Sequence, residues 1–193
     1  LHIATDGRPF VAGRNTVSRY TAAGPREIRD DFRNVTGLAL DAGDFLLVAD
    51  HDVGLVYRLH VDSGEGTPLT DSIPHPTRIT VADNGDIYIS DDESGAIYIQ
   101  SEGKTDLFAN DLIHPQGLAV DDTRVFVLDA GSNELLAFSR ENGERDILVS
   151  QLPLGSGTTG KRLVRAAGLT RTRDGALIVA ADGDGSLIRI TNA

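Results

Sequence analysis

The sequence predicts an all-β fold in which one four-stranded unit is repeated about five times. Three observations lead to this prediction: a repeat of about 40 residues, short segments rich in β-branched and aromatic residues, and no apolar stripe at helical spacing. One unit of this size cannot bury both faces of its sheet, so neighbouring units must pack against one another around an axis. Such an arrangement is a β-propeller, and each unit is one blade.

The repeats become visible when the chain is divided at a Gly-Leu-Ala motif and its relatives. NVTGLALDAGDFLLVAD opens the second repeat, PHPTRITVADNGDIYISD the third and IHPQGLAVDDTRVFVLD the fourth. A copy without its opening residues precedes them, and a fifth copy, RAAGLTRTRDGALIVAADGDGSLIRI, follows an insertion of about ten residues. We therefore predict a single β-propeller domain over residues 1–193, with repeats 1–33, 34–73, 74–112, 113–152 and 153–193.

The order of elements is the same in each repeat. A short apolar strand is followed by a second strand that ends in Asp, a Gly-containing turn, a third strand, a hairpin and a fourth strand. The hairpin carries Gly24, Gly64, Gly103 and Gly143 in the first four repeats, at a position that needs a residue tolerant of positive φ. Because the last repeat ends with its third strand, two interpretations stay open: five blades with an incomplete last blade, or a fragment of a six-bladed propeller.

Composition excludes several classes of protein. With 18 basic and 29 acidic side chains the formal net charge is −11, which argues against a basic nucleic-acid-binding domain. No apolar run approaches the roughly 18 residues of a membrane-spanning helix, so we expect no membrane insertion. Zero cysteines exclude a disulfide framework and Cys-based metal sites. The compartment stays open, and a secreted or periplasmic location is favoured if a leader upstream of Leu1 was removed.

The repeat resembles the NHL repeat. The resemblance rests on Pro-x-Gly-Leu-Ala-Val-Asp at residues 115–121, on related segments at 35–41 and 76–82, and on strands that end in Val-x-Asp. It covers essentially the whole chain, whereas the Trp-Asp ending of WD40 blades and the double glycine of kelch blades are absent. The wider superfamily that this resemblance implies includes SMP-30/gluconolactonase enzymes, streptogramin lyase and peptidyl-amidoglycolate lyase, so the fold leaves the function open.

Two columns of aligned residues are expected on one face. In propellers of this kind, the loops before the innermost strand and those between the second and third strands share a face, here called the top face. The candidate ligand-binding residues on it are Asn34, Asp50, His75, Asp91, His114, Gln116, Asp129, Lys161 and Arg165. Most belong to a column before the innermost strand or to an Asp column at the end of the second strand. His51 and Asp52 lie beside the Asp column.

Each feature of the top face has two interpretations. The Asp column consists either of caps that accept N–H bonds within their own turns or of cation ligands. His75 and His114 each precede a Pro, and they are either structural or hold a metal between adjacent blades. The insertion GSGTTGK, which ends at Lys161, has the spacing of a phosphate-binding loop, but Arg162 and a short following segment contradict that function. We interpret it as a loop over the top face.

The sequence therefore predicts a recognition module that binds a small ligand, a cation or a cationic protein or peptide at an acidic top face. The alternative is an enzyme, either a metal-dependent hydrolase of the SMP-30/gluconolactonase type or a propeller lyase. The resemblance to that hydrolase implies ligating Asn and Asp residues before the Gly of the innermost strand, where this chain has Gln116 and Ala167. The enzyme alternative would require a divalent metal, Ca²⁺, Mg²⁺ or Zn²⁺, as its cofactor.

Overall fold

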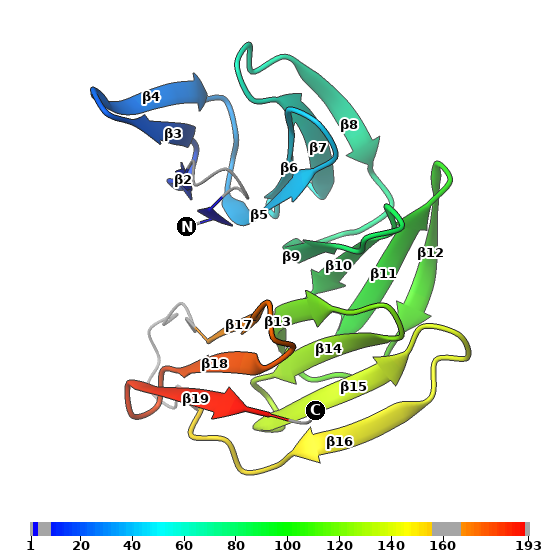
Figure 1. The fold of residues 1–193 in the computed structure, drawn as a ribbon. Helices are drawn as coiled ribbons and strands as arrows, with labels where there is room; N and C mark the ends of the chain where they lie inside the picture. The colour runs from blue at the N-terminus through cyan, green and yellow to red at the C-terminus, as the bar shows by residue number, and fades with distance from the viewer. Residues whose placement is uncertain (1, 4–8, 156–166, 192–193) are drawn as a thin grey trace. The chain divides into compact units, whose positions relative to one another are not determined.

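The computed structural model describes residues 2–3, 9–155 and 167–191 of the chain. Within these ranges every regular element is a strand, as the sequence predicts, and the strands form five antiparallel sheets in chain order (Figure 1). Four sheets have four strands and the fifth has three. The predictions of four-stranded blades and of a three-stranded last blade are confirmed.

The blades have the following bounds. Blade one contains β1 (His2–Ile3), β2 (Pro9–Ala12), β3 (Val17–Thr21) and β4 (Gly24–Arg29). Blade two contains β5 (Val35–Asp41), β6 (Phe45–Asp50), β7 (Leu55–His60) and β8 (Gly66–Thr70). Blade three contains β9 (Pro76–Val81), β10 (Ile87–Asp91), β11 (Ala96–Ser101) and β12 (Lys104–Ala109). Blade four contains β13 (Pro115–Val120), β14 (Arg124–Asp129), β15 (Glu134–Ser139) and β16 (Arg145–Val149). Blade five contains β17 (Gly168–Arg171), β18 (Leu177–Ala181) and β19 (Ser186–Ile190).

The chain divides into two compact units, each with its own core. The first contains residues 1–91 and 98–106, and the second contains residues 92–97 and 107–193. In the first unit, β6 supplies both of its faces to the core: Leu46 and Val48 pack toward blade one, whereas Leu47 and Ala49 pack toward blade three. Side chains alternate along a strand, so a continuous apolar run is what a strand buried on both faces requires. In the second unit a corresponding cluster fills the space between blades four and five.

The register within the blades confirms the alignment of the Asp column. In blades two, three and four the first residue of the innermost strand pairs with the last residue of the second strand: Val35 with Asp50, Pro76 with Asp91, and Pro115 with Asp129. The hairpin glycines of the first four repeats all have positive φ, from 71° to 111°. We call the end of a blade at which its innermost strand begins and its second strand ends the top end. No helix long and apolar enough to cross a membrane occurs among the described residues.

Candidate functional site

The Asp column is buried at the top ends of the blades. Asp50, Asp91 and Asp129 are between 0% and 2% exposed. In blade two, the two carboxylate oxygens of Asp50 accept the backbone N–H groups of Arg33 and Asn34, with N···O distances of 2.9 and 2.8 Å. The carboxylate therefore fastens the end of β6 to the loop that leads into β5, and it presents little charge to solvent.

Equivalent hydrogen bonds occur in blades three and four. Asp91 accepts the N–H of His75 at 3.1 Å, and Asp129 accepts the N–H of His114 at 2.7 Å. Asp129 also accepts the N–H of Gly131 within the carboxylate's own turn. The bonds from Arg33, Asn34, His75 and His114 come from donors 15 to 17 residues upstream, in the loop before the innermost strand. These carboxylates stabilise the register of the blade.

A polar cluster lies beside the Asp column where blades two and three meet. His51 Nδ1 lies 2.8 Å from Asp52 Oδ1, and Asn34 donates its side-chain N–H to the same oxygen at 2.9 Å. The ring of His51 is packed against that of His75, with 5.2 Å between the centroids. His51 is buried, whereas the side chain of Asp52 is 39% exposed. One carboxylate at the solvent boundary is thus held in place by two neighbouring side chains.

The environment of Asp52 favours its ionised form. The hydrogen bond from Asn34 is the largest cause that lowers the pKa of Asp52, followed by the bond from His51. The positive charge of Arg14 acts in the same direction, while partial burial opposes it. Hydrogen bonds donated to a carboxylate stabilise its charged form, so Asp52 carries a negative charge at neutral pH.

A hollow of about 800 Å³ opens next to Asp52, between the top ends of blades one and two. Its lining consists of Arg14, Asn15, Phe32, Arg33, Asp52 and Val53. Phe32 is 5% exposed and forms an apolar floor, whereas the other lining residues are exposed. Two guanidinium groups, one carboxylate and an aromatic ring therefore share one small surface.

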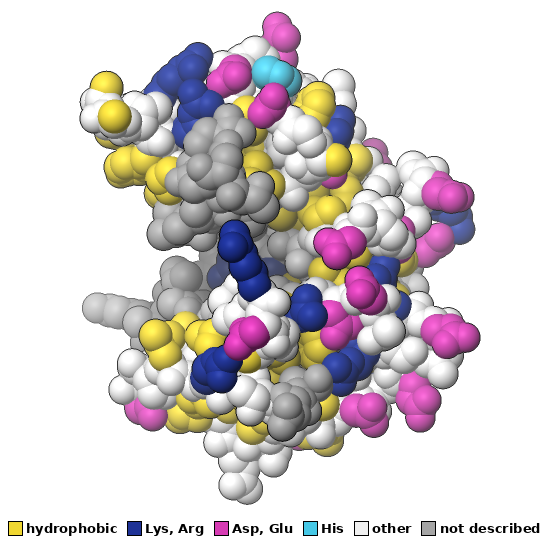
Figure 2. Space-filling model, viewed as in Figure 1, with side chains coloured by type: hydrophobic (Ala, Val, Ile, Leu, Met, Phe, Trp, Pro, Cys, Tyr) yellow, Lys and Arg dark blue, Asp and Glu magenta, His cyan; other side chains and the backbone are white. Residues whose placement is uncertain are grey.

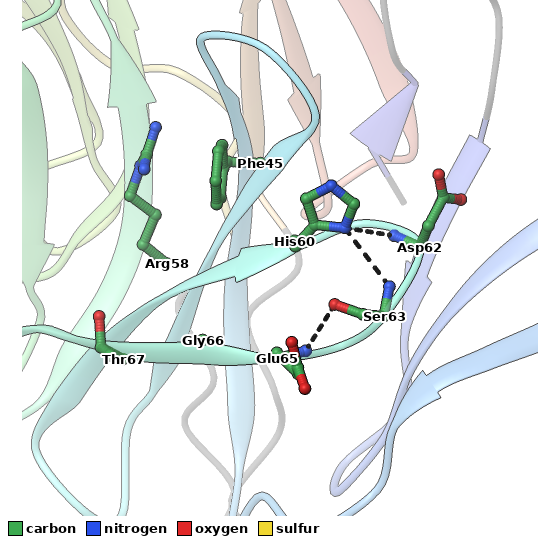
Figure 3. Close-up of a pocket in the computed structure, with 8 residues that line it drawn as sticks. All are labelled: Phe45, Arg58, His60, Asp62, Ser63, Glu65, Gly66 and Thr67. Carbon is green, nitrogen blue, oxygen red and sulfur yellow. Dashed lines mark hydrogen bonds between the residues drawn. The ribbon is translucent and has the colours of Figure 1, made fainter.

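A second hollow, of about 830 Å³, lies at the opposite end of blade two (Figure 3). Its lining consists of Phe45, Arg58, His60, Asp62, Ser63, Glu65, Gly66 and Thr67. The Arg58 guanidinium lies 3.7 Å from the centroid of the Phe45 ring and forms an ion pair with Asp41. His60 Nδ1 accepts backbone N–H groups of its own turn. Because these polar groups already have partners in the fold, the top-end hollow is the stronger candidate for ligand binding.

The remaining predicted site residues have separate surroundings. His114 Nδ1 lies 3.2 Å from the backbone oxygen of Asp92, and Gln116 is 8% exposed. Lys161 and Arg165 lie outside the described residues. Among the residues that the structure describes, no group of three or more His, Asp or Glu side chains could hold a metal ion. Metal binding by His75 and His114 together stays a prediction.

The charges on the surface are mixed in sign. On the face that Figure 2 shows, acidic side chains are interspersed with Lys and Arg side chains. In the hollow beside Asp52, two arginines face one carboxylate. Arg14 and Arg33 were not predicted, because neither belongs to the two aligned columns of the top face. The available signal was that Arg14 stands in the first repeat's loop between the second and third strands, which is the loop type that carries His51 and Asp52 in the next repeat.

Comparison with known proteins addresses the fold. No known protein family matches the sequence, and no curated protein matches it. The structure is similar to a chain of a nidogen/laminin complex, with a TM-score of 0.80 and 16% identity, covering 95% of this chain and 73% of that chain. The fold is a β-propeller. The chain spans about two thirds to three quarters of the length of such propellers.

Two other similar structures are enzymes. One is a catalytically inactive histidine-to-alanine variant of virginiamycin B lyase from Staphylococcus aureus with quinupristin, with a TM-score of 0.73, 16% identity, and coverage of 99% of this chain and 65% of that chain. The other is a gluconolactonase from Xanthomonas campestris, with a TM-score of 0.73, 22% identity, and coverage of 92% and 68%. At these identities the likeness establishes the fold, and the fold-level resemblance drawn from the repeats is confirmed.

Proposed function

We propose that this propeller is a recognition module, and that it binds a small ligand at the top ends of its first blades with a positively charged group of the ligand against Asp52. The observation that carries the proposal is the arrangement of Asp52 itself. Its Oδ1 is held by Asn34 and His51, while its Oδ2 has no hydrogen-bond partner among the described residues. A fixed, ionised carboxylate at the edge of a hollow binds an ammonium group without having to become ordered first.

The test uses leucine methyl ester, a small monocation with an apolar body, as the probe. Binding is followed by chemical-shift changes in the amide spectrum of the whole chain. Asp52→Asn keeps an oxygen for the bonds from Asn34 and His51 but removes the charge, so we expect at least a tenfold loss of affinity, on the order of one charge-assisted hydrogen bond. Asp83→Asn removes an exposed charge from a turn at the other end of blade three and should leave binding unchanged. Equal affinity of both variants would contradict the proposal.

A second function, catalysis, is favoured by one observation. Asp52 accepts the Nδ1–H of His51, which fixes the orientation of the imidazole, and a second imidazole, His75, packs against the first. The solved lyase variant is inactive with a histidine replaced by alanine, which gives a precedent within this fold. A His–Asp pair of this kind is suited to remove a proton from a substrate.

Catalysis is tested by incubating the protein with gluconolactone and with quinupristin, with and without a chelator, together with elemental analysis of the purified chain. Turnover that disappears in His51→Ala would support the lyase or hydrolase function. Loss of activity with the chelator would assign it to a bound metal. Turnover no faster in the parent than in His51→Ala would leave recognition as the proposed function.

A further inference from the structure

The hollow between blades one and two contains two exposed arginines, Arg14 and Arg33, and the positive charge of Arg14 acts on Asp52 in the same lining. Arginines elsewhere in the same unit form ion pairs: Arg19 bonds Asp62 at 2.9 Å, and Arg29 bonds Asp31. With two arginines and one aspartate, the lining of this hollow is net positive, although the whole chain has a net charge of −11.

The backbone on which these two arginines stand is fixed. The carbonyl oxygen of Arg14 accepts the N–H of Val35 at 2.7 Å, and that of Asn15 accepts the N–H of Phe32 at 3.3 Å. These bonds fasten the loop between β2 and β3 to the loop before β5. The N–H of Arg33, in turn, is held by the buried carboxylate of Asp50. The two arginine side chains thus extend from anchored backbone positions and line the same hollow as Phe32.

We infer that this hollow is an anion subsite for the carboxylate of a small zwitterionic ligand, with Arg14 and Arg33 binding the carboxylate and Asp52 binding the ammonium group. Guanidinium groups bind carboxylates through paired N–H bonds, so either arginine can hold the carboxylate of the ligand. The ammonium half of this assignment rests on the proposed function. The carboxylate half rests on the two arginines alone.

The apolar part of the lining specifies the rest of the ligand. Phe32 closes the floor and Val53, which is 46% exposed, stands at the rim. Burial of an apolar side chain against these two residues is favourable in proportion to the area removed from water. An α-amino acid with an apolar side chain combines the three required features: a carboxylate, an ammonium group and an apolar body.

Three probes separate the parts of this ligand. Leucine has both charges, N-acetylleucine keeps only the carboxylate, and leucine methyl ester keeps only the ammonium group. We expect the double variant Arg14→Gln, Arg33→Gln to lose at least about tenfold in affinity for leucine and N-acetylleucine and to bind the methyl ester as tightly as the parent or more so. Asp52→Asn should show the complementary pattern, with weaker binding of leucine and the methyl ester.

The control is Arg173→Gln, which removes an exposed arginine of blade five and should leave all three affinities unchanged. Amide spectra of the variants check that each one is folded. If the double arginine variant binds N-acetylleucine as the parent does, or if the parent binds none of the carboxylate probes, the anion subsite is refuted even where the methyl ester result upholds Asp52. If Asp52→Asn binds all three probes as tightly as the parent while the double arginine variant does not, the ammonium site is refuted and the arginine subsite stands.

Discussion

The imidazole rings of His51 and His75 are in contact, with their centroids 5.2 Å apart and their planes inclined by 40°. His51 follows the second strand of blade two, and His75 precedes the innermost strand of blade three. The contact therefore links the top ends of two successive blades, and through His51 it reaches the carboxylate of Asp52. A substitution at His51 or His75 should therefore change the surroundings of Asp52, the exposed carboxylate on which the proposed function depends.

The first prediction concerns the pKa of Asp52. Asn34→Ala removes the largest cause that lowers it, so the pKa should rise toward its ordinary value. The pKa of Asp52 is lower in the folded protein than in the unfolded chain, so ionised Asp52 stabilises the fold at pH values above the unfolded pKa. This stabilisation is lost as the pH falls through the folded-state pKa. Binding of leucine methyl ester should accordingly persist to lower pH in the parent than in Asn34→Ala. A carboxyl ¹³C titration measures both pKa values.

The matched control for this titration is Asp184. Its pKa is lowered chiefly by Ser186, whose backbone N–H donates to Asp184 Oδ1 at 2.9 Å, at a place that Asn34 does not contact. The titration of Asp184 should be the same in the parent and in Asn34→Ala. A variant in which Asp52 titrates as in the parent would show that the Asn34 bond does not stabilise the ionised carboxylate.

The second prediction concerns the structural role of the Asp column. Asp129 is 2% exposed and accepts N–H bonds from Ile113, His114 and Gly131 through both of its oxygens. Asp129→Ala leaves these donors without an acceptor, and we expect a loss of about 3 kcal/mol in the free energy of unfolding, at the upper end of the cost of one unsatisfied buried group. Urea denaturation measures the change through the midpoint at unchanged slope.

Asparagine is not a neutral replacement at this position. Its amide has one oxygen and one NH₂ group, so in Asp129→Asn a donor would face the N–H of Ile113 or that of His114. We expect a loss of stability between those of the parent and Asp129→Ala. Asp122→Ala, at an exposed position, serves as the control and should stay within about 0.5 kcal/mol of the parent. Similar midpoints for Asp129→Ala and Asp122→Ala would show that the column does not hold the blades together.

The repeats made much of the fold predictable. Once Gly64 and Asp129 are aligned with their counterparts, strand order and hairpin position follow, because a blade pairs strands that are neighbours in the sequence. The burial of Asp129 did not follow, since the sequence alone does not distinguish a carboxylate that caps its own turn from one that bonds a loop 15 residues upstream.

The arginine hollow was the least predictable feature. It depends on the bond from the N–H of Val35 to the carbonyl oxygen of Arg14, which joins loops of two different blades. The first repeat also contains no Gly-Leu-Ala motif to guide its alignment with the others. The sequence does not distinguish Arg14 and Arg33 from the arginines that form ion pairs, because the positions of the acidic side chains in space decide which arginines are paired.

The third prediction concerns the tautomer of His60 in the second hollow. Its Nδ1 accepts the N–H groups of Asp62 and Ser63 at 3.3 and 3.4 Å, as Figure 3 shows. A nitrogen that accepts hydrogen bonds is unprotonated, so the neutral ring should carry its proton on Nε2. Long-range ¹H–¹⁵N spectra at alkaline pH report this directly. A ring with its proton on Nδ1 would contradict the turn geometry.

The last prediction compares three glycines that occupy the same position in their repeats. In Gly117→Ala the new Cβ would lie 2.7 Å from the Cβ of Leu169 on β17 and 3.0 Å from that of Leu128. In Gly168→Ala the nearest atom is the Cβ of Ala180 at 3.8 Å, an ordinary contact. Overpacking in a buried sheet costs about 1 to 3 kcal/mol, so Gly117→Ala should be destabilised by that amount and Gly168→Ala by much less.

Gly37→Ala extends the comparison to the first unit. Its Cβ would lie 2.7 Å from the backbone oxygen of Thr77 on β9, so it should lose stability like Gly117→Ala. None of the three glycines has a positive φ, so the difference between the variants reports the closeness of the next blade rather than backbone strain. Thermal and urea denaturation of the three variants provide the measurement. Equal losses at Gly117 and Gly168 would mean that the innermost strands do not pack as closely between blades as the structure shows.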